Sequence, residues 1–176
     1  MQWAKQTRSG FTIVELLIVI VVIAILAAIT IVAYNGIQTR AREAKINSDL
    51  TALSKAIQVA RNNTSKTFYQ ISGSGYSSGG CVSKAVGTDL AALPLTDGCW
   101  VQYLDVLNDL SVASGMNVNN LVDPWGRPYF IDENEGENGT NCNVDTLGVF
   151  ALPFNGANRH PNFTVQPPKS GFTGCV

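Results

Sequence analysis

Residues 16–29 read LLIVIVVIAILAAI, fourteen apolar residues without a break. The apolar segment extends over residues 11–33, where only Thr12, Glu15 and Thr30 interrupt it. A helix needs about 20 apolar residues to cross the hydrocarbon core of a bilayer. The segment is therefore long enough to span a membrane, and the rest of the chain has to be arranged around it.

The composition of the whole chain fits one modest domain with an anchor. Of the 176 residues, 45% are apolar and 14% are charged, and the formal net charge is −1. A near-neutral chain does not have the charge of a dedicated nucleic-acid binder, so no specific nucleic-acid partner is predicted. One histidine and four widely spaced cysteines, none in a CxxC pair, suit neither a His-based active site nor a zinc site. We predict no catalytic residues and no enzymatic activity.

The segment before the apolar run sets the orientation of the chain. Residues 1–10 read MQWAKQTRSG, with Lys5 and Arg8 and no acid. The positive-inside rule places this leader in the cytoplasm and the residues after Ala33 outside. A cleavable secretory signal and a retained signal anchor are the alternatives. The apolar run is longer than the ~7–15 residues usual in a secretory signal, and the residues after it continue a helical pattern.

Glu15 is the unusual residue of the apolar segment. An ionisable group inside a spanning helix costs free energy and is by default a functional hypothesis whose partner should be named. No cation lies within the segment. A cut between Gly10 and Phe11 would create an α-amine that is largely charged at neutral pH. Glu15 can then pair with that amine, within one chain at i,i+4 spacing or between neighbouring chains.

The sequence from Ser9 to Ile20, SGFTIVELLIVI, closely resembles the type IV pilin and pseudopilin signature. The resemblance is specific over residues 1–35 and loose afterwards. It implies cleavage after Gly10 and N-methylation of Phe11 by a prepilin peptidase. It also implies that Glu15 serves subunit registration in a helical filament. Many members carry a proline midway along this helix, which this chain lacks.

The same resemblance implies a location and a set of partners. The precursor is expected in the inner or cytoplasmic membrane as a single-pass protein with its N-terminus inside, and the assembled form in an extracellular filament. The partners would be the prepilin peptidase, the assembly platform with its ATPase, the membrane before assembly, and other copies of the chain in a helical homopolymer.

The apolar pattern becomes one-sided in residues 36–62. A stripe follows at helical steps of 4, 3, 4 and 3, which predicts an amphipathic helix whose apolar face is core: Ile46, Leu50, Leu53, Ile57 and Ala60. The run from Asn62 to Ser65 is the expected stop. Residues 11–35 and 36–62 would thus form one helix.

Residues 63–176 form the expected head, which is rich in Gly, Ser, Asn, Thr and Pro. Strands are predicted at Phe68–Ile71, Tyr129–Ile131 and Thr146–Leu152, and a short helix at Leu104–Val112. The head is too poor in apolar runs to form a large core alone. We therefore predict an α+β fold in which a small antiparallel sheet packs on the amphipathic half of the long helix.

All four cysteines lie in the predicted exterior region, and an even number there predicts two disulfides. Three connectivities are possible. Sequential pairing is favoured because it closes local loops: Cys81–Cys99 and Cys142–Cys175. The second pair resembles the C-terminal disulfide loop of many pilins.

A second patch, Asp123–Tyr129 (DPWGRPY), resembles the D-P-W-G-x-P-Y patch of major pseudopilins. Proline and glycine there predict a tight turn. In pseudopilins a following loop binds calcium, which implies a site of four acids here: Asp132, Glu133, Glu135 and Asp145. Residues 143–148 depart from the pseudopilin pattern, and a solvated acidic loop without a metal is the alternative.

The leading hypothesis is therefore a structural subunit of a type IV pilus that serves motility, adhesion or DNA uptake. A pseudopilin of a type II-like secretion system, or a minor pilin, is the alternative that the DPWGRPY patch favours. An uncleaved, membrane-anchored binding protein is the third hypothesis, and Glu15 with the Gly10–Phe11 junction argues against it. An exported enzyme comes last.

Overall fold

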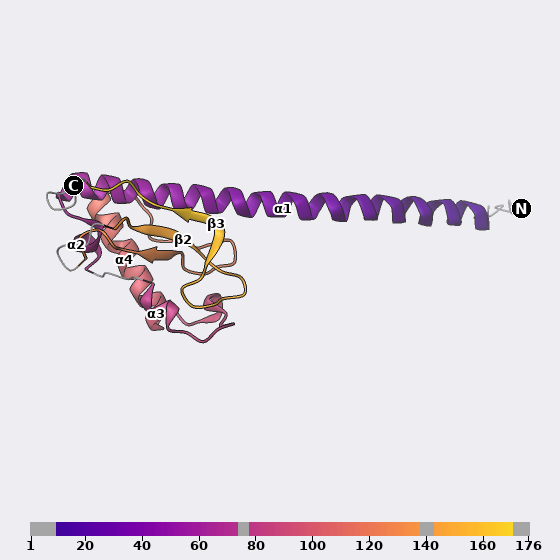
Figure 1. Cartoon of the computed structure of the whole chain (residues 1–176). Coiled ribbons are helices and arrows are strands. Elements are labelled where there is room, and N and C mark those ends of the chain that lie inside the picture. Colours follow the sequence, from indigo (N-terminus) through magenta and orange to yellow (C-terminus); the bar gives the residue numbers. More distant parts are fainter. Residues whose placement is uncertain (1–9, 74–77, 138–142, 171–176) are drawn as a thin grey trace, which may run out of the picture. The chain divides into compact units, whose positions relative to one another are not determined.

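The computed structural model describes residues 10–73, 78–137 and 143–170. Lys5 and Arg8 of the leader lie outside these residues. Figure 1 shows the elements, which in chain order are α1 (Ile13–Thr64), α2 (Phe68–Ser72), α3 (Gly79–Val82), the 3-10 helix η1 (Leu90–Ala92), α4 (Gly98–Ser114), β1 (Phe130–Asp132), β2 (Thr146–Phe150) and β3 (Arg159–Val165). The chain divides into two compact units, Met1–Ala41 and Arg42–Val176, which are described separately.

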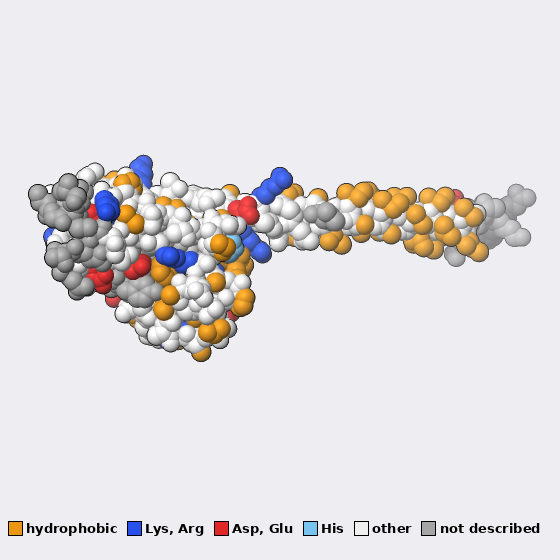
Figure 2. Space-filling view, viewed as in Figure 1, with side chains coloured by type: hydrophobic (Ala, Val, Ile, Leu, Met, Phe, Trp, Pro, Cys, Tyr) orange, Lys and Arg blue, Asp and Glu red, His pale blue; other side chains and the backbone are white. Residues whose placement is uncertain are grey.

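In the first unit, the apolar segment is helical and its side chains are exposed. Large apolar residues from Phe11 to Ile31 are each about half or more exposed, and Figure 2 shows hydrophobic side chains along this part of α1. Among the described residues, α1 is the helix long and apolar enough to cross a membrane. The hydroxyl of Thr30 donates to the Ala27 carbonyl oxygen at 3.0 Å, so this polar group is satisfied within the helix.

In the second unit, α1 supplies one wall of the core. The five residues of the predicted stripe, Ile46, Leu50, Leu53, Ile57 and Ala60, are all fully buried. They form one cluster with residues of α4, such as Tyr103 and Leu107, and of the sheet, such as Ile131 and Val149. The amphipathic prediction is thereby confirmed: the stripe is core.

The sheet has three antiparallel strands in the order β1-β2-β3. Phe130 pairs with Gly148 in the first ladder, and Leu147 pairs with Val165 in the second, where an irregularity falls between Gly148 and Phe150. Every residue of β2 is buried, as expected for a central strand. The α+β prediction is confirmed, with a small sheet against the amphipathic half of α1.

One predicted strand is wrong. Phe68–Ile71 belongs to the helix α2, because a reciprocal capping box starts a helix there. The Thr67 side chain accepts from the Gln70 N–H at 3.3 Å, and the Gln70 side chain accepts from the Thr67 N–H at 3.1 Å. Phe68, predicted to start a strand, is the buried residue of this helix.

Two other elements differ from the prediction. The expected helix at Leu104–Val112 lies within the longer α4, which starts six residues earlier. The Asp97 carboxylate caps α4 by accepting from the Cys99 N–H at 2.9 Å. At its other end, Gly115 adopts φ 71°, a left-handed conformation that favours glycine. The strand β3 has no counterpart among the predicted strands; its residues are mostly exposed, and its apolar side chains Phe163 and Val165 pack on the core.

A disulfide joins Cys81 of α3 to Cys99 of α4, the first of the two expected pairs. Both half-cystines are buried in a second apolar cluster with Leu90, Phe130 and Phe150 among its members. The expected Cys142–Cys175 pair lies outside the described residues.

Candidate assembly site

The Gly10–Phe11 junction lies in exposed backbone just before α1 begins. Phe11 is 89% exposed. A β-carbon added to Gly10 would meet no atom of the described residues within 4 Å. The part of the chain that the structure describes therefore places no steric demand for glycine at this position.

Glu15 is held by Thr12, a partner that sequence reasoning did not identify. Its Oε2 accepts from the Thr12 N–H at 2.8 Å and from the Thr12 hydroxyl at 2.7 Å. Thr12 Oγ1 in turn accepts from the Glu15 N–H at 3.2 Å. This is a reciprocal capping box, and the pattern Thr-x-x-Glu ahead of an apolar run is the signal that could have found it.

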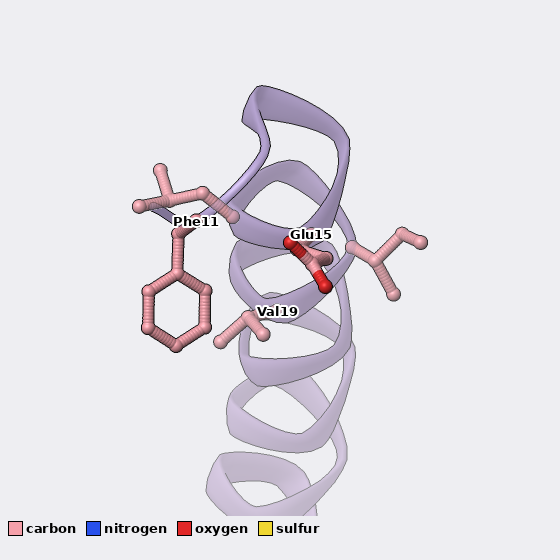
Figure 3. A pocket seen from close by; sticks show the side chains of 5 residues that line it. Phe11, Glu15 and Val19 are labelled. Atoms are coloured by element: carbon pink, nitrogen blue, oxygen red, sulfur yellow. The ribbon is translucent and has the colours of Figure 1, made fainter. Parts of the chain in front are cut away.

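Around Glu15 the helix surface is apolar. Glu15 lies in a shallow depression that is also lined by Phe11, Leu16, Ile18 and Val19. Figure 3 shows the Phe11 and Val19 side chains on one flank of the helix and the Glu15 carboxylate beside them. Glu15 is the only acid between residues 11 and 35. The carboxylate of Glu15 is therefore the one negative charge in an otherwise apolar surface.

In the second unit, the DPWGRPY patch forms a tight turn around Asp123. The buried Asp123 carboxylate accepts from the backbone N–H groups of Trp125 and Arg127 at 2.9 and 2.8 Å, and from Arg127 Nε at 2.8 Å. Arg127 also donates to the Phe150 carbonyl oxygen at 3.0 Å. The turn is thereby fixed to the end of β2.

The aromatic residues of this patch connect it to α1. The Trp125 ring has the guanidinium carbon of Arg42 5.8 Å from its centroid and that of Arg127 at 5.3 Å, both within cation–π range. The buried Tyr129 hydroxyl donates to Asp49 Oδ2 at 2.7 Å. Burial, together with the hydrogen bond to Asp49, raises the pKa of Tyr129. These contacts hold the turn against α1.

Two of the four acids expected to bind calcium contact a cation of the chain itself. Arg61, in the last turn of α1, forms ion pairs through Nη2 with Glu135, at 2.7 Å from Oε2, and with Asp145 Oδ2. The Glu135 N–H also donates to Asp145 Oδ1 at 2.8 Å. All three side chains are almost completely buried. Burial raises the pKa of Asp145 to about 6, against the opposing effect of Arg61.

The other two acids lie elsewhere on the loop. Asp132 ends β1 and is partly buried, which raises the pKa of its carboxyl. Glu133 is fully buried. Within residues 10–73, 78–137 and 143–170, no three acidic, histidine or cysteine side chains converge where they could hold a metal ion. The donor set as it stands does not fit calcium, because a guanidinium lies between two of its carboxylates.

Comparison with known proteins supports the interpretation of the N-terminal segment. Residues 5–31 match the family model described as the prokaryotic N-terminal methylation motif. Type II secretion system core protein G of Klebsiella michiganensis is 32% identical over 62 residues, which is 35% of this chain and 44% of that protein. The chain thus aligns with less than half the length of this relative. No match to a solved structure was found.

Proposed function

We propose that this chain, which carries the N-terminal methylation motif of the type IV pilin and pseudopilin family, is a structural subunit of a type IV pilus. Members of that family are structural proteins, not enzymes. The observation that carries the proposal is the exposed apolar surface of α1 with the single carboxylate of Glu15 at its start. Such a surface needs cover, first from a membrane and then from the same surface of neighbouring subunits.

In this proposal the four segments have distinct roles. Residues 1–10 are a leader that prepilin peptidase removes, and Phe11 becomes the methylated N-terminus. Residues 11–35 anchor the precursor and later form the filament core. Residues 36–62 carry the head, residues 63–176, which lies on the filament surface. An assembly platform and its ATPase extract the subunits from the membrane.

Glu15 acts by charge pairing during assembly. In the free subunit its carboxylate is satisfied by Thr12 of the same chain. Once apolar segments pack around it, the amine of Phe11 from an incoming subunit needs a counter-charge, because a buried unpaired charge costs several kcal/mol. No other acid lies between residues 11 and 35 to provide one. The pairing also sets register, since an offset subunit leaves both charges unmatched.

A pseudopilin of a secretion machine is the second candidate. Two observations favour it: the DPWGRPY turn and the alignment with core protein G. A pseudopilin would use the same processing and the same charge pairing, so the N-terminal segment does not separate the two functions. They differ in the filament that results and in what its loss abolishes.

The discriminating experiment compares the wild-type organism with a strain that lacks this chain. Electron microscopy of sheared surface filaments, with mass spectrometry of their subunits, should show thin filaments several micrometres long made mainly of this chain. Unchanged surface filaments in the deletion strain, together with loss of exported proteins from the medium, would instead establish the pseudopilin. An uncleaved binding protein would instead be recovered from wild-type membranes with residues 1–10 still attached, and would be missing from the filaments.

A further inference from the structure

We propose that Arg61 is a built-in cation of the head: its guanidinium does what a bound metal ion would do between the same oxygen atoms. The head is then independent of calcium, although its acidic loop follows the turn that implies a calcium site. The inference concerns the fold of the second unit and goes beyond the assembly function proposed above.

The contacts of Arg61 bring together three separate segments of the chain. Arg61 lies in the last turn of α1, Glu135 and Asp145 flank the loop between β1 and β2, and Pro168 belongs to the tail after β3. Arg61 Nη2 pairs with both carboxylates, and Nη1 donates to the Pro168 carbonyl oxygen. A single guanidinium therefore crosslinks the helix, the loop and the tail.

The oxygen atoms around Arg61 are the kind that calcium takes. They comprise carboxylate oxygens of Glu135 and Asp145 and the carbonyl oxygen of Pro168, all hard ligands. The side chains of Arg61, Glu135 and Asp145 are 4%, 0% and 0% exposed. In such a buried site the guanidinium and a divalent ion would repel each other strongly. Arg61 thus replaces the ion and cannot act beside it.

The fork of the guanidinium is essential to this role. Arginine presents its donors in a rigid plane and reaches several acceptors at once, whereas lysine is a compact point charge. Within the described residues, Arg61 Nε is a buried nitrogen without a hydrogen-bond partner, so the side chain is held by its two terminal nitrogens. Lysine at this position would keep the charge and lose the simultaneous contacts.

The tail next to Pro168 depends on the same cluster. The Ser170 N–H and hydroxyl donate to Glu135 Oε1 at 2.9 and 2.7 Å. Lys169, which lies between Pro168 and Ser170, is exposed. The Lys169–Ser170 peptide bond is therefore accessible to solvent but held on both sides, through Pro168 to Arg61 and through Ser170 to Glu135. Its cleavage by trypsin reports directly on the crosslink.

The first test is the melting temperature of the full-length chain in detergent, with calcium chloride, magnesium chloride or EDTA. We expect wild-type Tm to be the same in all three. Arg61→Met should lower Tm by about 10 °C, since it leaves two buried carboxylates without their cation. Calcium at about a hundredfold excess over its Kd should then raise Tm of this variant by about 5 to 10 °C, and magnesium by less. The exposed Arg40, changed to Met, is the matched control and should behave as wild type.

A rise of wild-type Tm with calcium equal to that of Arg61→Met would overturn the proposal, because metal and guanidinium would then coexist. A folded Arg61→Met variant whose Tm does not change with calcium would also overturn the proposal. If that variant does not fold, Arg61→Lys replaces it and should show faster tryptic cleavage after Lys169, with cleavage after Lys84 unchanged. Calcium should not slow this cleavage, because the lysine keeps the positive charge. Cleavage of Arg61→Lys at the wild-type rate would contradict the crosslinking role of the fork.

Discussion

Thr12 and Glu15 cap each other at the start of α1, so the carboxylate proposed to register subunits already has two hydrogen bonds from its own chain, at 2.7 and 2.8 Å. These bonds offset part of the cost of placing the charge in an apolar segment before assembly. In the proposed assembly, this local polar partner would be exchanged for the cation of another subunit.

Glu15→Leu should insert in the membrane and be cleaved after Gly10 but fail to form filaments when it is the only copy, although leucine makes the helix more apolar. Glu15→Asp, one methylene shorter, should be partly defective. The measurement compares membrane and sheared-filament fractions. Glu43→Leu, which removes an exposed acid outside the apolar segment, is the control and should assemble. Normal filament yield from Glu15→Leu would disprove charge pairing.

Thr12→Val should destabilise the first turn of α1 by about 1 kcal/mol. The hydroxyl that accepts from the Glu15 N–H is lost, whereas the size and shape of the side chain are kept. We expect faster amide hydrogen exchange in the first turn for the variant in detergent micelles, and a wild-type rate for Thr12→Ser. Equal exchange in Thr12→Val and wild type would show that the cap does not stabilise the helix in a lipid-like environment.

Filament subunits should begin at a methylated Phe11. A retained leader would bring Lys5 and Arg8 into the apolar packing, at the cost of intramembrane cations. Gly10→Val should leave the fold intact, because no atom of residues 10–73, 78–137 or 143–170 would lie within 4 Å of the added β-carbon, and should block cleavage by crowding the peptidase. Mass spectrometry of filaments and of the accumulated precursor checks both statements; an intact Met1 in wild-type filaments would refute the first.

Tyr129→Phe should destabilise the head by about 1 to 2 kcal/mol, since the buried Asp49 loses the phenol hydrogen bond. This corresponds to a fall in Tm of about 3 to 6 °C. Tyr34→Phe, at a position that is 61% exposed, is the control and should leave Tm unchanged. A Tyr129→Phe protein as stable as the control would mean that Lys45, which also binds Asp49, satisfies that carboxylate alone.

The pH dependence of stability should carry the signature of Asp145. Its pKa is about 6 in the fold and 3.8 as the ordinary value, so the native state binds a proton more readily than the unfolded state. The resulting stabilisation is complete below pH 3.8 and is lost as pH rises through 6. Arg61 and Glu135 are the charged groups that face Asp145. The Asp145→Asn variant should no longer lose stability between about pH 4 and 6.5. An unchanged profile of Tm against pH in the variant would assign the decline to other groups.

The parts of the fold that local periodicity controls could be predicted from the sequence. The buried stripe from Ile46 to Ala60 follows from helical spacing, and β1 and β2 follow from β-favouring apolar runs. The strand prediction at Phe68–Ile71 is wrong because it weighs the β-favouring residues and overlooks the capping box of Thr67 and Gln70, which starts a helix there. The strand β3 escapes prediction because its His, Pro and Asn residues belong to a mostly exposed strand that only tertiary pairing stabilises.

Of the candidate sites, the one formed by neighbouring residues could be predicted from the sequence, and the one formed by distant residues could not. Gly10, Phe11 and Glu15 can be identified because they form a contiguous motif. The Arg61 cluster cannot, because 84 residues separate Arg61 from Asp145 and no local pattern links them. In the sequence, Arg61 is one of several basic residues beside the apolar stripe, and the acids form an acidic loop. Only the packing of the loop against the end of α1 makes them one cluster.

The two polar anchor points on α1, Asp49 and Arg61, are separated by about three helical turns, or ~18 Å along the axis. Tension applied along α1 in the proposed filament would load both points, because each joins the helix to other segments of the head. The load would then be shared between two separated contacts. A head attached to its helix at two separated points, one by a hydrogen bond and one by ion pairs, should stay folded under loads that would break either attachment alone.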